Sequence, residues 1–262
     1  MILKNVLNNF KDKHILFLIL ENILWYTKEQ VYLNWDEKID NKTFEKIKSM
    51  YEKYEKENIP IEYILWYCKF MNENFIVNEN TLIPRPETEY LVLQALKNIW
   101  KDDIILDIWT WSGIIAIMLN KLTNNQTWAI DISEKALKVA KQNAKNILKN
   151  TDNIHFLKSN LLENFQFQKW KKYIICANLP YVKEDFNLDK LAKKEPATAL
   201  FAWKDGLLFY RKLLEQIKNI SYTAYFELTN EQAKTLESEY NLNFQIFPTC
   251  HKNIKILKIE KI

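Results

Sequence analysis

The fold of this chain is decided by ten consecutive residues, Ile104-Ile105-Leu106-Asp107-Ile108-Trp109-Thr110-Trp111-Ser112-Gly113. An apolar run that ends in an aspartate, followed by a short loop and the helical run Ile114–Lys121, predicts a strand–loop–helix unit. The pattern repeats at once, because Thr127–Asp131 predicts a second strand and Ser133–Leu148 predicts a helix with Ser133 as its N-cap. Repeated units of this length predict a doubly wound sheet, in which ligands bind at the carboxyl ends of the strands.

Further strands are predicted downstream, at Ile154–Leu157, Tyr173–Ala177, Tyr222–Leu228, Phe244–Phe247 and Ile254–Ile259. We expect the last two to form an antiparallel pair that closes the sheet. Together with the two strands above, they predict an α/β fold with a Rossmann-like, seven-stranded mixed sheet.

The first 65 residues have a different pattern, without strand alternation. Between residues 43 and 58, the aromatic and aliphatic side chains of Phe44, Ile47, Tyr51 and Tyr54 recur at helical spacing, with Lys and Glu between them. We therefore expect a small helical bundle at residues 1–65, as a domain of its own.

A short connecting segment follows the bundle. Scattered apolar residues among Asn and Thr predict a hairpin linker at residues 66–86, and Pro84 and Pro86 keep its end extended. Pro86 begins a helix that is expected to run to about Ile99, with acidic residues in its first turn. The sheet domain is accordingly expected at residues 87–262.

Composition excludes several classes of protein. Hydrophobic residues make up 48% and charged residues 27% of the 262 residues, which a disordered chain does not show. The apolar run Ile15–Leu20, which no other apolar run of the chain exceeds in length, is too short for a membrane span and lacks a cleavage site after it. The widely spaced Cys68, Cys176 and Cys250 predict no zinc site and no disulfide, and favour a cytoplasmic location. The net charge of +4 is too small to indicate nucleic acid.

Polar residues follow three of the predicted strands. Asp107 ends the first strand, Asp131 ends the second, and Asn178-Leu179-Pro180-Tyr181 follows the strand at 173–177. An acid at the second strand end commonly binds the ribose hydroxyls of a nucleoside. A single such acid is more often a capping or turn residue, but three polar strand ends in this order favour a nucleoside cofactor.

Longer motifs accompany these strand ends. They are Tyr63-Ile64-Leu65-Trp66, Leu82-Ile83-Pro84-Arg85-Pro86-Glu87-Thr88-Glu89, Glu195-Pro196-Ala197-Thr198-Ala199-Leu200, Trp203-Lys204-Asp205-Gly206-Leu207, and Glu227 with Gln232 in the fifth strand and its loop. Over nearly the whole chain, the set resembles the class I S-adenosylmethionine-dependent methyltransferases. More narrowly, it resembles the N5-glutamine methyltransferases that modify bacterial peptide chain release factors. The run at 83–89 carries the narrower resemblance, because Asn-Pro-Pro-Tyr, to which residues 178–181 are similar, also occurs in DNA and RNA amino-methyltransferases.

The resemblance implies a cofactor, a substrate and a set of site residues. The cofactor is S-adenosyl-L-methionine, and the substrate is a glutamine in the Gly-Gly-Gln loop of a class-1 release factor, which the helical bundle is expected to dock. We expect a monomer that uses no metal. The implied cofactor-binding residues are Asp107, Trp109, Thr110, Trp111, Ser112, Gly113, Asp131, Asn160, Leu161 and Asn178, and the implied catalytic residues are Asn178, Leu179, Pro180 and Tyr181.

Two positions depart from the family pattern. Leu179 replaces the commoner first proline of the tetrapeptide, which leaves its backbone carbonyl in place. Asn160 stands where the family usually has an acid beside the adenine, and it still offers one acceptor oxygen.

The chemistry of the substrate explains why a tetrapeptide of this kind is needed. An amide nitrogen is a poor nucleophile, because its lone pair is delocalised into the carbonyl. The Asn178 side-chain oxygen and the Leu179 carbonyl are two acceptors that can hold the amide N–H groups and aim the nitrogen at the sulfonium methyl. Pro180 would restrict the conformation of the loop, and the Tyr181 side chain would form one wall of the substrate pocket. The competing interpretation of the tetrapeptide is an Asn-capped turn.

The tryptophan content is abnormal. The chain has nine tryptophans and two glycines, where about 18 glycines are usual. The family's cofactor loop is Asp-x-Gly-x-Gly-x-Gly, yet this chain has Trp109 and Trp111 in it, where an indole would occupy the cofactor's volume. A non-glycine residue at positive φ also costs about 1–2 kcal/mol. Our hypothesis is that many or all of the tryptophans are UGA codons that the source organism reads as glycine; Trp66, Trp100 and Trp203 also stand at expected glycine positions, and Trp25, Trp35, Trp128 and Trp170 at segment ends or in loops.

The sequence is also compatible with other functions. The same chemistry could act on a glutamine of a ribosomal protein, or on an exocyclic amine of DNA or RNA. If the indoles at 109 and 111 are genuine, the chain could instead be a catalytically dead protein whose bundle only binds a partner. Cofactor titration separates the enzyme from the binding module.

Overall fold

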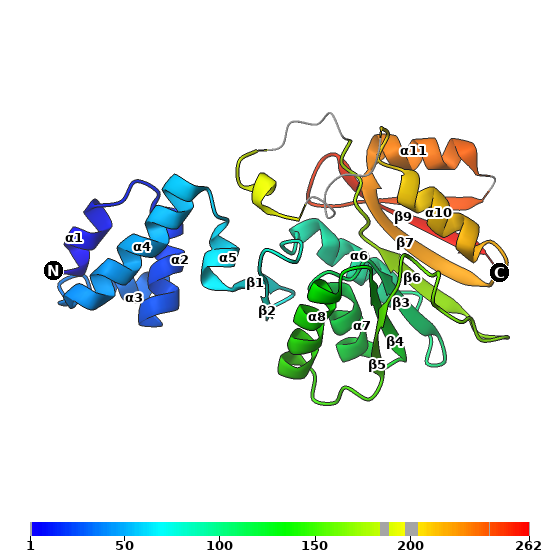
Figure 1. The fold of residues 1–262 in the computed structure, drawn as a ribbon, viewed down its shortest axis with the longest axis horizontal. Coiled ribbons are helices and arrows are strands. Elements are labelled where there is room, and N and C mark those ends of the chain that lie inside the picture. The colour runs from blue at the N-terminus through cyan, green and yellow to red at the C-terminus, as the bar shows by residue number, and fades with distance from the viewer. Residues whose placement is uncertain (1, 184–188, 197–203, 241, 262) are drawn as a thin grey trace. The chain divides into compact units, whose positions relative to one another are not determined.

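The computed structural model describes residues 2–183, 189–196, 204–240 and 242–261. The chain forms two compact units. One comprises Met1–Trp66 with Asp189–Lys194, and the other comprises Tyr67–Leu188 with Glu195–Ile262 (Figure 1).

The first unit is helical, as its sequence pattern predicts. Its helices are α1 (Leu3–Asn8), α2 (Lys13–Leu24), α3 (Lys28–Leu33), α4 (Asn41–Glu57) and α5 (Ile61–Leu65), with a 3₁₀ turn at Ala192–Lys194. Each longer helix begins at a capping side chain, because Asp12 accepts a hydrogen bond from the Ile15 N–H and Asp40 accepts one from the Thr43 N–H. Ile47 and Tyr51 are the buried residues of α4, which confirms its predicted apolar stripe.

The second unit contains the large sheet. In the described residues it has seven strands in the order β5-β4-β3-β6-β7-β9-β8. The strands are β3 (Ile104–Ile108), β4 (Thr127–Asp131), β5 (Ile154–Lys158), β6 (Tyr173–Ala177), β7 (Tyr222–Thr229), β8 (Asn243–Pro248) and β9 (Ile254–Lys261). β3 to β7 are parallel, and β9 runs antiparallel to both β7 and β8. The predicted seven-stranded mixed sheet is confirmed.

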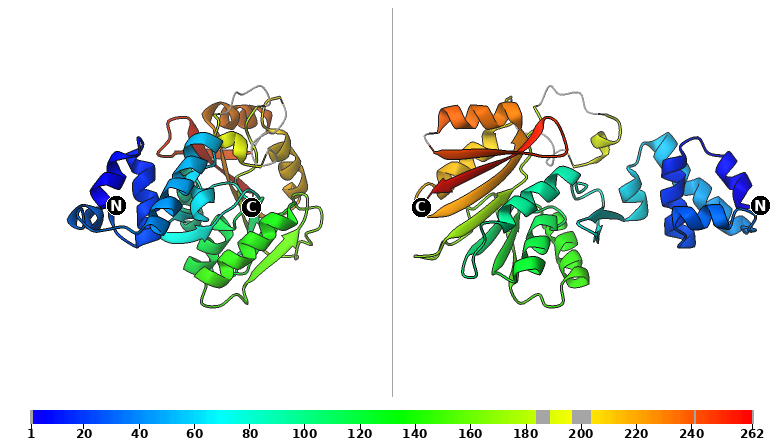
Figure 2. Two further views of the ribbon diagram at one scale, coloured as in Figure 1. Left: turned by 60° about the vertical axis from the view of Figure 1, so that its left-hand side comes forward. Right: turned by 180° about the vertical axis from the view of Figure 1, so that it is seen from behind.

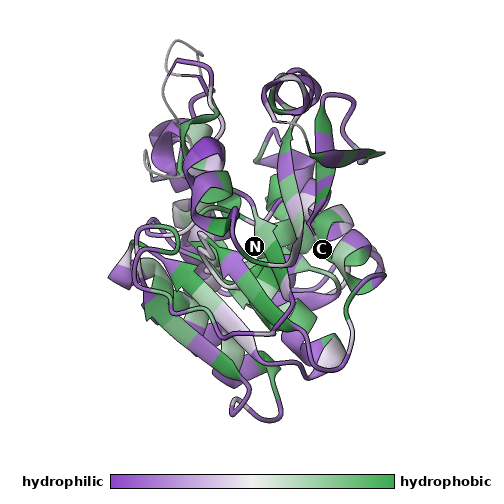
Figure 3. Cartoon of the chain, turned by 90° about the vertical axis from the view of Figure 1, so that its right-hand side faces the viewer, coloured by the Kyte–Doolittle hydropathy of each residue, from purple (hydrophilic) through white to green (hydrophobic). Residues whose placement is uncertain are grey.

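Helices cover both faces of this sheet (Figure 2). α6 (Pro86–Leu96), α7 (Ile114–Thr123) and α8 (Glu134–Ile147) lie on one face, and α10 (Leu208–Ile217) and α11 (Asn230–Glu239) lie on the other. Successive strand side chains point to opposite faces, so Ile105 packs with the first set of helices while Leu106 packs with the second. The central strands are accordingly apolar on both faces (Figure 3).

α10 and α11 are not among the helices predicted from the sequence. The signal was present for α10, because its buried residues Tyr210, Leu213, Leu214 and Ile217 recur at i, i+3, i+4 and i+7. α11 also shows a start signal, since Thr229 and Gln232 form a capping box. Gln232 therefore lies in the first turn of a helix and not in the loop where the sequence places it.

The predicted hairpin is formed by β1 (Tyr67–Phe70) and β2 (Glu73–Ile76). It packs within the second unit, where Phe70 and Phe75 join the core under α6 and α7. Asn143 of α8 attaches it, donating to the Ile76 carbonyl at 3.0 Å and accepting from the Ile76 N–H at 2.7 Å. The hairpin is thus part of the sheet unit.

The order of the strands sets where a ligand can bind. The chain runs outward from β3 through β4 to β5, and then returns to place β6 on the other side of β3. This reversal opens a crevice at the carboxyl ends of β3, β4 and β6.

The described residues contain no helix with the length and apolar character that a membrane span requires.

Candidate active site

Asp107 lies one residue before the end of β3 and is fully buried. Its Oδ2 accepts hydrogen bonds from the Thr110 hydroxyl at 2.5 Å and from the Ala116 N–H at 3.0 Å. Its Oδ1 is buried with no hydrogen-bond partner among the described residues. Burial raises the pKa of Asp107 to about 7, and the charge of Asp131 adds to the rise. The free oxygen is the kind of group that a polar ligand satisfies.

Asp131 ends the neighbouring strand β4. Its Oδ2 accepts from the Trp111 N–H at 2.9 Å and its Oδ1 accepts from the Ser133 N–H at 2.8 Å, so it ties the loop after β3 to the start of α8. Burial raises the pKa of Asp131 to about 6. A carboxylate has about four lone-pair sites, so both oxygens can still accept from hydroxyl groups.

Asn178 follows β6 and takes part in a buried chain of hydrogen bonds. Its Nδ2 donates to Thr88 Oγ1 at 3.1 Å, and Thr88 Oγ1 donates to Glu227 Oε2 at 2.7 Å. Thr88 lies in the first turn of α6 and Glu227 lies on β7, so three separate motifs meet here. Burial raises the pKa of Glu227 to about 7, although the hydrogen bond from Thr88 opposes the rise.

The rest of the tetrapeptide is held by the other helical layer. The Tyr181 carbonyl accepts from Gln232 Nε2 at 2.8 Å, and the same amide donates to the Asp205 carbonyl at 3.0 Å. The Tyr210 hydroxyl lies 3.3 Å from the Leu179 carbonyl and also donates to the Glu227 carbonyl. Because a carbonyl oxygen has two lone pairs, the Leu179 carbonyl keeps an acceptor site. Burial raises the pKa of Tyr181, so its hydroxyl stays neutral.

The segment before α6 is anchored by a buried acid. Glu195 accepts a hydrogen bond from the Ile83 N–H at 3.0 Å and forms an ion pair with Arg85. The motif at 82–89 is therefore fastened at its start by Glu195 and at Thr88 by Glu227. Residues 197–200 and Trp203 of the quoted motifs lie outside the described residues.

Asn160 and Leu161 lie just beyond the carboxyl end of β5, on the same edge of the sheet as Asp131. Asn160 Nδ2 donates to Glu163 Oε1 at 2.6 Å, which leaves its acceptor oxygen outside that bond. Leu161 is buried at a φ of 51°. Across the described residues, no group of three or more His, Cys, Asp and Glu side chains is placed to hold a metal ion.

The indoles of Trp109 and Trp111 fill the space between these groups. Both are 5% exposed, with ring centroids 6.2 Å apart, and the Trp109 ring packs 4.6 Å from that of Phe209. Trp111 Nε1 donates to the Asn178 carbonyl at 3.4 Å. The cavity that both indoles line together with Thr88 and Asn178 is about 10 Å³, enough for about one water molecule, whereas ligand sites hold about 300–1,000 Å³. The acids fit a nucleoside cofactor, and the two indoles do not.

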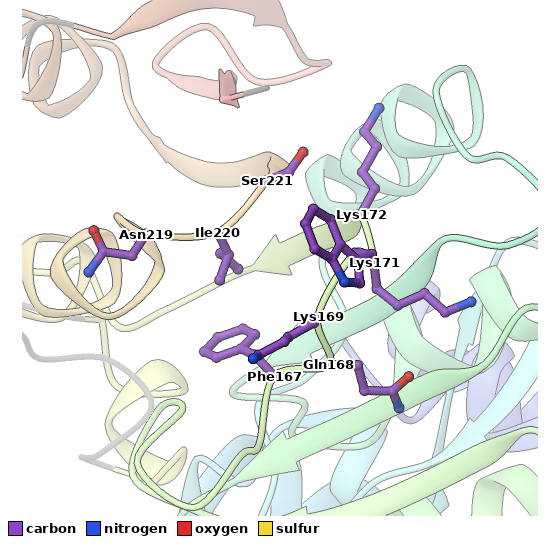
Figure 4. Close-up of a pocket in the computed structure, with 9 residues that line it drawn as sticks. Phe167, Gln168, Lys169, Lys171, Lys172, Asn219, Ile220 and Ser221 are labelled. Carbon is purple, nitrogen blue, oxygen red and sulfur yellow. The ribbon is translucent and has the colours of Figure 1, made fainter.

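Larger hollows lie elsewhere on the sheet unit. One of about 670 Å³ opens at the amino ends of β6 and β7, the edge of the sheet opposite to the acids (Figure 4). It is lined by Phe167, Gln168, Lys169, Trp170, Lys171, Lys172, Asn219, Ile220 and Ser221. Another, of about 600 Å³, adjoins Tyr181 and Gln232 at the carboxyl edge. Only the second is near the tetrapeptide.

The fold has counterparts among solved structures. The catalytic domain of hMettl16, in complex with the MAT2A 3'UTR hairpin 1, matches 97% of this chain and 92% of that chain with a TM-score of 0.58 and 12% identity. A family model described as ribosomal protein L11 methyltransferase matches residues 86–180. The doubly wound sheet, with acids at the ends of β3 and β4 and Asn178 after β6, defines a class I methyltransferase with S-adenosylmethionine as its cofactor.

Full-length relatives give the family. A release factor glutamine methyltransferase of Flavobacterium psychrophilum is 38% identical over 90% of this chain and 87% of the relative. One of Francisella tularensis subsp. tularensis is 35% identical over 95% of this chain and 87% of the relative. The chain belongs to the release factor glutamine methyltransferase family.

The structure agrees with the sequence on where the strand-end residues lie, and it adds contacts that the sequence does not show. Asp107, Asp131, Asn160 and Asn178 are all at the carboxyl edge, as the predicted strand ends require. The sequence assigns no role to Thr88 or Glu227, and only the structure shows that the two side chains are hydrogen-bonded to each other.

Proposed function

We propose that this protein transfers the methyl group of S-adenosylmethionine to the side-chain amide nitrogen of a glutamine in the Gly-Gly-Gln loop of a class-1 peptide chain release factor. The observation that carries the proposal is the similarity to release factor glutamine methyltransferases along about nine-tenths of the chain. The meeting of Thr88, Asn178 and Glu227 adds support, because the motif that narrows the resemblance lies against the tetrapeptide.

In this proposal the tetrapeptide holds the amide. The Asn178 Oδ1 and the Leu179 carbonyl accept the two amide N–H groups, which leaves one face of the nitrogen directed at the methyl carbon. Pro180 restricts the loop and Tyr181 walls the pocket. The hollow beside Tyr181 and Gln232 gives the release-factor loop room to approach.

The cofactor is assigned to the crevice at the ends of β3 and β4. Asp131 accepts the ribose hydroxyls, and Asp107 holds the loop through Thr110 while its unpartnered Oδ1 is left to accept a hydrogen bond from the cofactor. The loop from 109 to 113 supplies backbone contacts, and Asn160 and Leu161 border the adenine. S-adenosylmethionine supplies an electrophilic methyl group, so positioning and electrostatics account for most of the rate.

The helical unit is assigned to docking of the release factor. It carries its own buried core, with Ile19 and Ile47 fully buried, and is therefore built as a separate module. We also propose that the protein acts as a monomer in the cytoplasm.

Methyl transfer from labelled cofactor to a purified class-1 release factor tests this function. A chain carrying Trp109→Gly and Trp111→Gly should label the factor, and Gln→Ala in the Gly-Gly-Gln loop of the factor should abolish the label. Ribosomal protein, DNA and RNA serve as competing substrates in parallel reactions. Label that survives the Gln→Ala change, or that appears faster on another substrate, would reject the assignment.

A further inference from the structure

Tryptophan is over-represented among the residues of this protein that have a left-handed backbone conformation, with positive φ. Ten non-glycine residues in the described part of the chain have positive φ, and half of them are tryptophans. The other five include three asparagines, a residue type that tolerates this region, whereas a bulky side chain there is an outlier. The tryptophans are Trp25 (60°), Trp66 (66°), Trp109 (70°), Trp111 (53°) and Trp170 (65°).

Three of these five gain little from burial. Trp25, Trp66 and Trp170 are 87%, 60% and 100% exposed, so the burial of their side chains does not offset the free-energy cost of the strained backbone. Trp25 and Trp66 directly follow α2 and α5 in the left-handed conformation, at positions where helices commonly end on glycine. The backbone at these positions is the one that glycine adopts.

The other two block the cofactor site. Trp109 and Trp111 are buried in the loop after Asp107, where Trp111 contacts both Asp131 and Asn178, and the cavity that the two indoles line with Thr88 and Asn178 is only about 10 Å³. The burial is also imperfect, because Trp109 Nε1 has no hydrogen-bond partner among the described residues. Two indoles at positive φ, in the one crevice that must hold a nucleoside, conflict with the family to which the chain belongs.

We infer that the functional polypeptide carries glycine at positions 25, 66, 109, 111 and 170, with UGA codons read as glycine during its synthesis. Glycine removes the backbone strain at all five positions and opens the crevice at two of them. The other described tryptophans, Trp35, Trp100 and Trp128, have ordinary φ, so the backbone does not single them out. In particular, α6 is capped by Lys97, and Trp100 is not at the glycine position that the sequence predicts for it.

Peptide mass spectrometry of the protein isolated from its source cell tests this directly. Peptides that span positions 25, 66, 109, 111 and 170 should contain glycine, and tryptophan at 109 and 111 would overturn the inference. Recombinant chains give a second test by calorimetric titration with S-adenosylmethionine. The Trp109→Gly, Trp111→Gly chain should bind at least about 100-fold more tightly than the chain with both tryptophans. Equal affinity of the two chains would contradict it.

Two exposed tryptophans, one with positive φ and one with ordinary φ, allow the cost of the strained backbone to be measured without an activity assay. Trp170→Gly should raise Tm by about 3 °C, because it relieves a positive φ. Trp100→Gly, at a position that is 74% exposed with ordinary φ, should not raise it. A Trp170→Gly chain that is no more stable than the Trp100→Gly chain counts against the inference.

A separate observation concerns the orientation of the Asn178 carboxamide. Asn178 Nδ2 donates to Thr88 Oγ1, whose own proton is donated to Glu227 Oε2. The Thr88 hydroxyl has a single proton and donates it to Glu227, so Thr88 turns a lone pair toward Asn178, and this acceptor pairs with the amino group of the carboxamide. The Asn178 oxygen is thereby left for another donor.

We propose that Thr88 and Glu227 are positioning residues, which orient the Asn178 carboxamide so that its oxygen faces the substrate amide; this rests on the proposed function. The Asn178 side chain also has a hydrogen bond to Glu227, so the Thr88 hydroxyl and the Glu227 carboxyl group hold its amino end together. Loss of the Thr88 hydroxyl weakens this hold, and the carboxamide then turns over more readily and presents a donor to the amide N–H groups. The two ends of a carboxamide are nearly the same size, so only hydrogen bonding distinguishes them.

Thr88→Val in the Trp109→Gly, Trp111→Gly chain tests this second proposal, because valine keeps the shape and removes the hydroxyl. We expect kcat for methyl transfer to fall about tenfold or more, with the cofactor Kd changed less than about twofold. Thr88→Ser should restore kcat. An active parent chain whose Thr88→Val variant keeps its kcat overturns the positioning role, whereas an inactive parent chain rejects the proposed function itself.

Discussion

Replacing Asn178 by alanine in the Trp109→Gly, Trp111→Gly chain should lower kcat for methyl transfer by about 100- to 1,000-fold. The substitution removes the side-chain acceptor that holds the substrate amide and leaves the Leu179 carbonyl alone. An amide held at one N–H group can rotate, so its nitrogen is no longer aimed at the methyl carbon. Single-turnover transfer to the release factor measures the loss without interference from product release.

The control for this prediction is binding of the cofactor. Asp107, Asp131 and the loop between them hold the cofactor in our proposal, so its Kd should rise less than about tenfold in the Asn178→Ala chain. Asn160→Ala is a matched amide variant at the same sheet edge, and it should reduce cofactor affinity more than kcat. An Asn178→Ala chain that retains full kcat would show that the tetrapeptide does not hold the amide.

Gly206→Ala should destabilise the protein by about 3 kcal/mol and also impair transfer. A Cβ at position 206 would lie 2.2 Å from the Tyr181 carbonyl oxygen and 2.3 Å from Gln232 Nε2, and the residue has a φ of 75°. The nearest clash is with backbone, so the tetrapeptide and α11 must move apart, which breaks the Gln232 hydrogen bond to Tyr181.

Urea unfolding monitored by circular dichroism measures this change, with kcat measured in parallel. Lys204→Ala is the control, because Lys204 is exposed two residues away. It should change the free energy of unfolding by less than about 0.5 kcal/mol. A Gly206→Ala chain that matches Lys204→Ala in both stability and kcat would show that position 206 does not brace the tetrapeptide.

Most of the secondary structure could be predicted, because its signals are local. The strands at Thr127–Asp131 and Tyr173–Ala177 have the predicted bounds, since each is a short apolar run with a polar residue close after it. α10 and α11 escaped prediction although each carries a local signal. At the site, the strand-end residues were predictable because parallel strands bring their carboxyl ends to one edge.

The contact of Thr88 with Glu227 could not be predicted in the same way. The two residues are 139 positions apart, and Thr88 is 90 positions from Asn178. Nothing in a local pattern specifies which polar side chains meet across such separations, because the meeting depends on how α6 packs against β6 and β7.

The sequence by itself determined the order of the strands along the chain, the helices other than α10 and α11, the motif residues and the excess of tryptophan over glycine. These follow from spacing and composition, which are properties of the chain alone. Only the tertiary structure decided that three distant motifs share one hydrogen-bonded chain, and that five tryptophans have the backbone of glycine. The physical reason is that the surrounding packing sets the backbone φ and the side-chain contacts at those positions. The residue type indicates only how much free energy a given backbone conformation or contact costs there.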